Sequence, residues 1–263
     1  DGYRTSVDPP TAVGDFARLD RLFSDERPTL AAFTRTIDDA DGVWRMRVYN
    51  KAEPIALSDL LPLLGHLGLR ALDEHAYRFV INGIECFVYD IGVRVPDGVQ
   101  IGNLRHTEVR SALEGLLAGT IEPDGFNRLI LLAGLTASQV NVLRCFAKYA
   151  HQTGFTFSQS YVESSLARLP HLVRLLVDLF EARFDPDLDE TERVVIVEAT
   201  KSAVRAALDD VPSLDDDRIG RTFLALVEAT VRTSAYRGTP TMAFKFDPSM
   251  VPDLPEPRPA NEI

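Results

Sequence analysis

The chain has 263 residues, of which 45% are hydrophobic and 25% are charged. These values are typical of a globular protein rather than a disordered one, and the length allows one large domain or two ordinary ones. The formal charge of -11 argues against nucleic acid and anionic membranes as partners, because both require clustered Lys and Arg side chains.

The predicted elements begin with a helix after Pro9-Pro10, with Thr11 as its N-cap and a run to Phe23. Its apolar residues support a helix over this stretch. These residues are Val13, Phe16, Leu19, Leu22 and Phe23.

Two strands are predicted next, at Thr29 to Thr36 and at Val43 to Tyr49, with a turn at Asp41-Gly42 between them. The second strand alternates, so one face should pack on a core and the other should be wet or covered by a polar partner. Trp44, Met46 and Val48 form the apolar face, and Arg45 and Arg47 form the other.

Ser58 should cap a short, leucine-rich helix. Two long strands follow, from Arg70 to Val80 and from Ile84 to Val93. They are joined by Asn82-Gly83, a pair that favours the positive φ angles of a type I′ hairpin turn. We expect an antiparallel sheet with the two helices of this region on one face.

Pro96-Asp97-Gly98 marks an expected boundary, beyond which almost all signals are helical. The predicted helices span 103–118, 124–133, 136–152, 158–168, 170–184, 190–209 and 214–235. Capping residues support five of these starts, namely Asn103, Asp124, Thr136, Ser158 and Ser213.

A short strand is predicted at Thr241 to Phe246, and the proline-rich stretch Val251 to Pro259 reads as a stiff linker. Three regions are therefore expected: a mixed helix and strand module at 1–100, a helical domain at 101–238, and a strand with a linker at 239–263. The fold class is α+β.

Catalytic motifs are not apparent. Neither G-x-G-x-x-G nor G-x-x-x-x-G-K-[ST] occurs, and nucleotide folds of either kind need glycines where the backbone approaches phosphate. Cys86 and Cys145 are isolated and suggest core positions in a reducing compartment. We expect no catalytic, cofactor-binding or metal-binding residue in this chain. The histidines are scattered, at His66, His75, His106, His151 and His171.

An aromatic cluster surrounds Gly154 and contains Phe155, Phe157 and Tyr161. Packing at a helix corner is the favoured interpretation. The alternative is an anchor for a neighbouring domain or subunit, because buried aromatic side chains commonly dominate interface energies.

Targeting signals are also not apparent. The longest apolar runs, such as Leu129 to Ala133, are far too short to span a bilayer. The chain does not begin with Met and carries no basic and apolar leader. We expect an internal piece of a cytoplasmic protein.

Several blocks resemble, in the same order, the large bacterial-type NAD-specific glutamate dehydrogenases. The most specific wording is AKYAHQTGFTFSQSYVESSL, followed by LLVDLFEARFDP. Three further blocks are DGYRTSVDPPTAVGDFARLDRL, WRMRVYNKAEPIALSDLLPLLGHLGLRALDE and FKFDPSMVPDLPEPRP. The resemblance is to the segment that precedes the catalytic domain.

This resemblance implies that the intact enzyme oxidatively deaminates L-glutamate to 2-oxoglutarate and ammonia and reduces NAD. It also implies that the chain continues past Ile263 into the domain with the substrate lysines and the nucleotide-binding fold. Our chain would then be a non-catalytic regulatory or scaffold fragment without a cofactor of its own. Its partners would be its own catalytic domain and other subunits of a homo-oligomer, with no nucleic acid or membrane.

The order helix, strand, strand, helix, strand, strand resembles an ACT-like, ferredoxin-like module with the order βαββαβ. The first strand is missing before Thr11 and an extra strand follows at the end. Either the last strand occupies the vacant place or an upstream segment supplies it. The alternative function is that this module binds an amino-acid effector and controls the enzyme allosterically. A free-standing small enzyme is a third and minor hypothesis.

Overall fold

The computed structural model describes the chain except for residues 1, 25–27, 35–41, 100–102, 240 and 261–263, and except for the side chains of 103–105. It divides into two compact units, Asp1–Leu131 and Leu132–Ile263. The sequence indicated boundaries at 100 and 238 instead. The helix Asn103–Leu117 (α4) falls in the first unit because it packs on the first strand. Each unit is described by itself.

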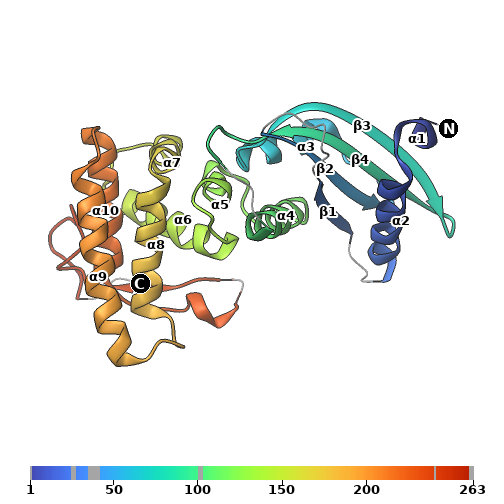
Figure 1. The fold of residues 1–263 in the computed structure, drawn as a ribbon. Helices are drawn as coiled ribbons and strands as arrows, with labels where there is room; N and C mark the ends of the chain where they lie inside the picture. Colours follow the sequence, from blue (N-terminus) through green and yellow to red (C-terminus); the bar gives the residue numbers. More distant parts are fainter. Residues whose placement is uncertain (1, 25–27, 35–41, 100–102, 240, 261–263) are drawn as a thin grey trace. The chain divides into compact units, whose positions relative to one another are not determined.

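The first unit contains a four-stranded antiparallel sheet (Figure 1). The order of its strands in space is β1-β2-β4-β3. The strands are β1 (Thr29–Thr34), β2 (Val43–Lys51), β3 (Arg70–Ile81) and β4 (Ile84–Arg94). β4 lies between β2 and β3, in the place that is vacant when α2 is counted as the first helix of the module.

The hairpin between β3 and β4 is confirmed, with positive φ at both Asn82 and Gly83. Residues 35 and 36 of the predicted first strand and residue 41 of the predicted turn lie outside the described residues.

The helices of this unit lie on both faces of the sheet, and our expectation of a single face is wrong. α2 (Pro9–Ser24) packs on the face that carries Tyr49 and Val88. The other face carries Trp44 and Tyr89. It is covered by α4 and by α3 (Leu57–His66), which contact each other. A short helix α1 (Gly2–Ser6) precedes α2, and η1 (Gly125–Asn127) and α5 (Arg128–Leu132) follow α4.

This arrangement redefines the ACT-like module. The order from β1 to α4 is ββαββα. This is the order βαββαβ with its last strand moved to the start. Its two helices are therefore α3 and α4, on one face. α2 is an additional element that covers the opposite face.

Two predicted helix starts in this unit are wrong. α2 begins at Pro9, and the Asp8 carboxylate accepts the backbone N–H of Thr11 at 3.0 Å, so Asp8 acts as the cap. α3 begins at Leu57 after Ala56, which makes no side-chain cap. The Ser58 hydroxyl bonds instead to the Asp59 carboxylate at 3.3 Å.

The second unit is mainly helical and closes with a two-stranded antiparallel sheet. Its elements are α6 (Ala137–Gln152), α7 (Gln159–Arg168), α8 (Pro170–Phe184), α9 (Glu190–Asp209), α10 (Leu214–Ala229), β5 (Thr230–Thr233), η2 (Ala235–Arg237) and β6 (Phe244–Phe246).

Side-chain capping within a few residues fixes where several helices of this unit begin. The capping box at α6 is complete, because Gln139 N–H donates to the Thr136 hydroxyl and Thr136 N–H donates to the Gln139 side chain. Ser158 and Ser213 cap α7 and α10 as predicted. The prediction that the last helix runs to residue 235 is wrong. Its end at Ala229 is set by the pairing of β5 with β6.

The core of this unit is aromatic. Phe146 lies 5.2 Å from Phe244 and 6.0 Å from both Phe180 and Phe246, between ring centroids. The ring of Tyr149 stacks on Phe246 at 4.3 Å. The short sheet is therefore attached to α6 and α8 by aromatic packing. No helix within the described part of the chain is both long and apolar enough to cross a membrane.

Candidate functional site

A buried ion-pair network joins α2 to the sheet of the first unit. Arg47 on β2 donates to the carboxylates of Asp15 on α2 and Asp90 on β4, with the Asp90 bond at 2.7 Å. All three residues are nearly inaccessible, with Asp15 exposed by 1%, Arg47 by 6% and Asp90 by 7%. A charge this far from water is tolerated only when it is paired and hydrogen-bonded, so this network fixes where α2 sits.

Two tyrosines complete the coordination of Asp15. Tyr49 donates its hydroxyl to Asp15 at 2.7 Å, and Tyr3 donates at 2.5 Å. Burial, together with the bond to Asp15, raises the pKa of both phenols far above the ordinary value. Both hydroxyls therefore remain neutral donors. Burial alone would lower the pKa of Arg47, but the Asp90 and Asp15 carboxylates outweigh it, and its pKa is raised.

The network continues outward through Arg45. Its guanidinium bonds to Asp90 at 2.8 Å and to Asp73 on β3 at 2.5 Å. Gly92 on β4 makes this possible, because a Cβ there would collide with the Asp73 carboxylate and the Arg45 guanidinium. Charged side chains therefore bridge α2, β2, β4 and β3 in one continuous set.

His106 on α4 packs against the face of the sheet opposite to α2. Its ring meets the edge of Trp44 at 4.5 Å and lies 5.9 Å from Phe33. Its Nε2 is buried without a hydrogen-bond partner among the described residues. Burial in this apolar setting lowers the pKa of His106.

A pH dependence follows from the lowered pKa of His106. Unfolded histidine titrates near pH 6.5, so below that pH the unfolded state binds more protons than the folded one. The free energy of unfolding of the first unit should then fall as the pH is lowered from about 7 to about 5. Urea unfolding followed by Trp44, the one tryptophan of the chain, measures this unit.

His106→Leu should flatten this pH dependence. His75→Leu is the matched control, since the side chain of His75 is 62% exposed and should leave the dependence unchanged. Equal slopes for the two variants would show that His106 is not its source.

The aromatic cluster around Gly154 divides into two parts. Phe155 is buried, as corner packing predicts. Phe157 and Tyr161 stack at 5.3 Å nearer the surface. Arg218 on α10 lies 5.7 Å from the Phe157 ring, so this pair also attaches α7 to α10.

Ion pairs and hydrogen bonds between α7 and α10 strengthen this attachment. Arg168 bonds twice to Asp216, at 3.1 and 2.5 Å, and the Tyr161 hydroxyl donates to Asp215 at 3.0 Å. The bond from Arg168 holds the pKa of Asp216 below its usual range. Tyr161 itself remains 37% exposed, which leaves surface for an anchor role.

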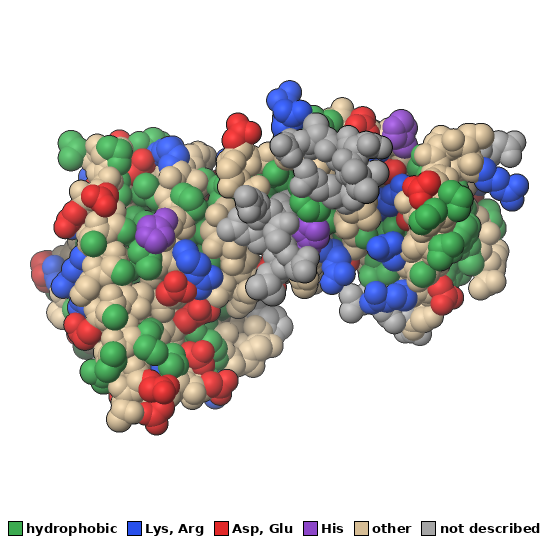
Figure 2. Space-filling view, in the orientation of Figure 1, with side chains coloured by type: hydrophobic (Ala, Val, Ile, Leu, Met, Phe, Trp, Pro, Cys, Tyr) green, Lys and Arg blue, Asp and Glu red, His purple; other side chains and the backbone are tan. Residues whose placement is uncertain are grey.

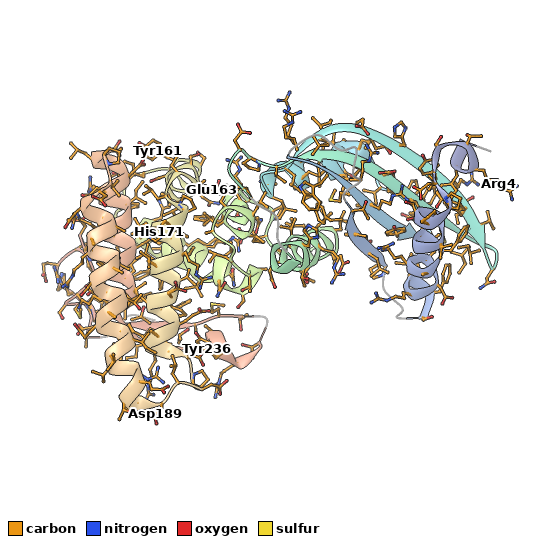
Figure 3. The ribbon with its side chains drawn as sticks, in the orientation of Figure 1. Arg4, Tyr161, Glu163, His171, Asp189 and Tyr236 are labelled. Carbon is orange, nitrogen blue, oxygen red and sulfur yellow. The ribbon has the colours of Figure 1, made fainter. Side chains whose placement is uncertain are left out.

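A cavity of about 190 Å³ lies between α6, α8 and η2 in the second unit. Its floor is apolar, with Val142, Val177 and Phe180. Its polar groups include Glu181, which accepts from Gln139 at 2.5 Å, and Tyr236. Figure 3 labels Tyr236 beside the lower part of α8. Apolar walls with a few polar groups are typical of small-molecule sites.

The sequence-selected residues do not converge. Cys86 is buried in the core under α2, and Cys145 is half-buried on α6. No set of three His, Cys, Asp or Glu side chains within the described ranges is placed to hold a metal ion. The residues that do converge, Asp15, Arg47 and Asp90, were not selected. The alternation of arginines in β2 was the one available signal.

The fold and these sites define a class of protein, an ACT-type module followed by a helical unit. Family models agree with this class. Residues 28–107 match the model "Glutamate dehydrogenase, ACT3 domain", and residues 121–186 match "Glutamate dehydrogenase, helical motif 3". Residues 203–263 match "Bacterial NAD-glutamate dehydrogenase, catalytic domain".

The chain belongs to the family of bacterial NAD-specific glutamate dehydrogenases. Proteins named NAD-specific glutamate dehydrogenase from Halomonas elongata and Mycobacterium tuberculosis are each 35% identical to it, over 99% and 100% of the chain. The protein of that name from Pseudomonas aeruginosa is 34% identical over 100% of the chain. The chain spans only 16% to 17% of the length of these relatives.

The matches also refine two expectations. The ACT3 match begins at residue 28, after α2, which agrees with α2 being an addition to the module. The catalytic-domain match begins at residue 203, within α9, whereas we expected that domain to begin beyond Ile263.

Proposed function

We propose that this chain supplies a regulatory and structural part of an NAD-dependent glutamate dehydrogenase. The intact protein would convert L-glutamate, NAD and water to 2-oxoglutarate, ammonia and NADH in the cytoplasm. The observation that carries the scaffold role is the Asp15–Arg47–Asp90 network. It attaches α2 to a sheet whose other face is covered by α3 and α4, so both faces of the sheet are packed.

NAD itself is assigned to a part of the protein outside this chain. Dinucleotide folds bind at the carboxyl ends of parallel strands, in a crevice between two halves of the sheet. The sheet of the first unit is antiparallel throughout its described strands, and the small sheet of the second unit is also antiparallel. These sheets therefore do not fit NAD.

Exposed aliphatic side chains support contacts with other domains or with other subunits of a homo-oligomer. The hairpin of β3 and β4 exposes Val80 by 65% and Ile84 by 43%. α9 exposes Val194 by 59% and Val195 by 69%. Neighbouring exposed aliphatic side chains of this kind are typical of surfaces that meet another protein.

An activity assay tests whether catalysis requires parts of the protein outside this chain. The purified chain should form no NADH from L-glutamate and NAD, because the substrate and cofactor sites are assigned elsewhere. Turnover above a mock purification, retained after further purification and removed with the chain by specific depletion, would contradict the proposal.

Amino-acid sensing is the second candidate, and the cavity lined by Gln139, Glu181 and Tyr236 favours it. A volume of about 190 Å³ suits a molecule of amino-acid size. Calorimetric titration with a panel of amino acids tests this role. Binding that is lost in Glu181→Gln but kept in Glu163→Gln, a half-buried glutamate of α7 outside the cavity lining, would support it. No heat for any amino acid would leave the scaffold role alone.

A further inference from the structure

A second, smaller cavity lies in the first unit, where α2, β1 and α4 meet. Its volume is about 40 Å³. Its lining is dominated by arginines, in contrast to the net acidic chain. The lining residues are Arg18, Arg21, Leu30, Ala31, Arg110 and Glu114.

The side chains that line this cavity carry a net positive formal charge. The lining contains three arginines and one glutamate, and the Glu114 carboxylate accepts the backbone N–H of Ala31 at 2.8 Å. Within the described part of the chain, Arg18 and Arg110 make no ion pair or hydrogen bond. They differ in this from Arg45 and Arg47 of the neighbouring network, each of which is paired with two carboxylates.

The helices that carry Arg18 and Arg110 are positioned by ion pairs and packing within the first unit. Arg18 follows Asp15 by three residues on α2, so the buried network fixes the helix turn that carries Arg18. Its guanidinium lies over Gly14, where a Cβ would be 2.8 Å from Nη1. Arg110 comes from α4, which packs on β1. Figure 2 shows basic side chains, in blue, grouped on the face of this unit that carries α2 and α4.

The guanidinium groups of Arg18 and Arg110 would be matched chemically by an oxyanion. Like charges brought together repel each other, and an oxyanion between them removes the repulsion. The planar guanidinium presents several N–H donors that match a carboxylate or phosphate with two parallel bonds. A volume of about 40 Å³ exceeds what one water needs and accepts one such head group, with the rest of the ligand in solvent.

We propose that this cavity binds the oxyanion head of a small metabolite, a carboxylate or a phosphate, between Arg18 of α2 and Arg110 of α4. Occupancy connects α2 to α4 around the edge of the sheet and stabilises the first unit. The site is separate from the cavity in the second unit. It also does not depend on the proposed function, because its test reads binding and not turnover.

The experiment measures thermal unfolding of the full chain by Trp44 fluorescence, with inorganic phosphate or succinate added at millimolar concentrations. Sodium chloride at equal ionic strength is the reference. We expect the midpoint to rise with at least one oxyanion beyond the chloride reference. A rise with phosphate alone would indicate a phosphate-bearing ligand, and a rise with succinate alone would indicate a carboxylate ligand. A rise with both would indicate that the site binds either oxyanion.

Variants then locate the effect. Arg18→Gln and Arg110→Gln should each weaken the oxyanion affinity roughly tenfold, about 1.4 kcal/mol. Arg4→Gln removes an exposed arginine of α1 (Figure 3) and should leave the affinity unchanged. The proposal is overturned if neither oxyanion differs from chloride, or if all three variants respond like the original chain.

Discussion

Replacing Asp15 by Ala should lower the free energy of unfolding of the first unit by about 3 to 5 kcal/mol. The loss is large because Arg47 would remain charged and buried with one of its two carboxylates gone. The hydroxyls of Tyr49 and Tyr3 would also lose their acceptor. Urea unfolding followed by Trp44 fluorescence measures this unit selectively, because Trp44 lies on β2 and is the one tryptophan of the chain.

Two comparisons separate the network from a general effect on α2. Asp20→Ala removes an exposed aspartate of the same helix and should change the stability by less than about 0.5 kcal/mol. The double variant Asp15→Ala with Arg47→Met removes both charges, so it should be more stable than Asp15→Ala alone. A double variant that is less stable by the sum of the two single losses would show that the two charges act independently.

The sequence predicted the elements whose signals are local. The turn at Asn82-Gly83, the capping box at Thr136 and Gln139, and the start at Pro170 each depend on residues a few positions apart. These features form whatever the rest of the chain does, because the backbone preference or the bond lies within the segment itself.

The network under α2 was missed because it depends on pairs distant in sequence. Val13 and Phe16 share the helical spacing of the apolar residues of α2, yet they are exposed by 71% and 52%. The buried residues of α2 are Asp15, Leu19 and Leu22. An aspartate faces the sheet only because Arg47, from a strand more than thirty residues later, requires a carboxylate there. Neither residue alone signals the other.

The end of α10 was missed for the same kind of reason. Thr230 to Thr233 continues a helical pattern locally, and only its pairing with β6, across the residues between them, makes it a strand. The arginine-lined cavity likewise combines α2 and α4, which lie far apart in the chain. Arginines at 18, 21 and 110 cannot be grouped until the fold brings them together.

Replacing Phe146 by Ala should destabilise the second unit by about 3 to 5 kcal/mol. Its side chain is fully buried and contacts aromatic rings from α8 and from β6. Truncation would leave a cavity at the point where the short sheet joins the helices, and the surrounding aromatic rings could collapse into it only in part. Circular dichroism at the helical minimum measures the loss, because most of the second unit is helical.

The first unit provides an internal control for Phe146→Ala, since the Trp44 transition should stay unchanged while the helical transition moves to lower urea. Phe146→Leu keeps most of the apolar volume and should cost clearly less than Phe146→Ala. Tyr161→Ala removes a partly exposed ring at the junction of α7 and α10 and should also cost less. If Phe146→Ala moved both transitions together, the two compact units would unfold as one cooperative body and the chain would contain a single folding unit.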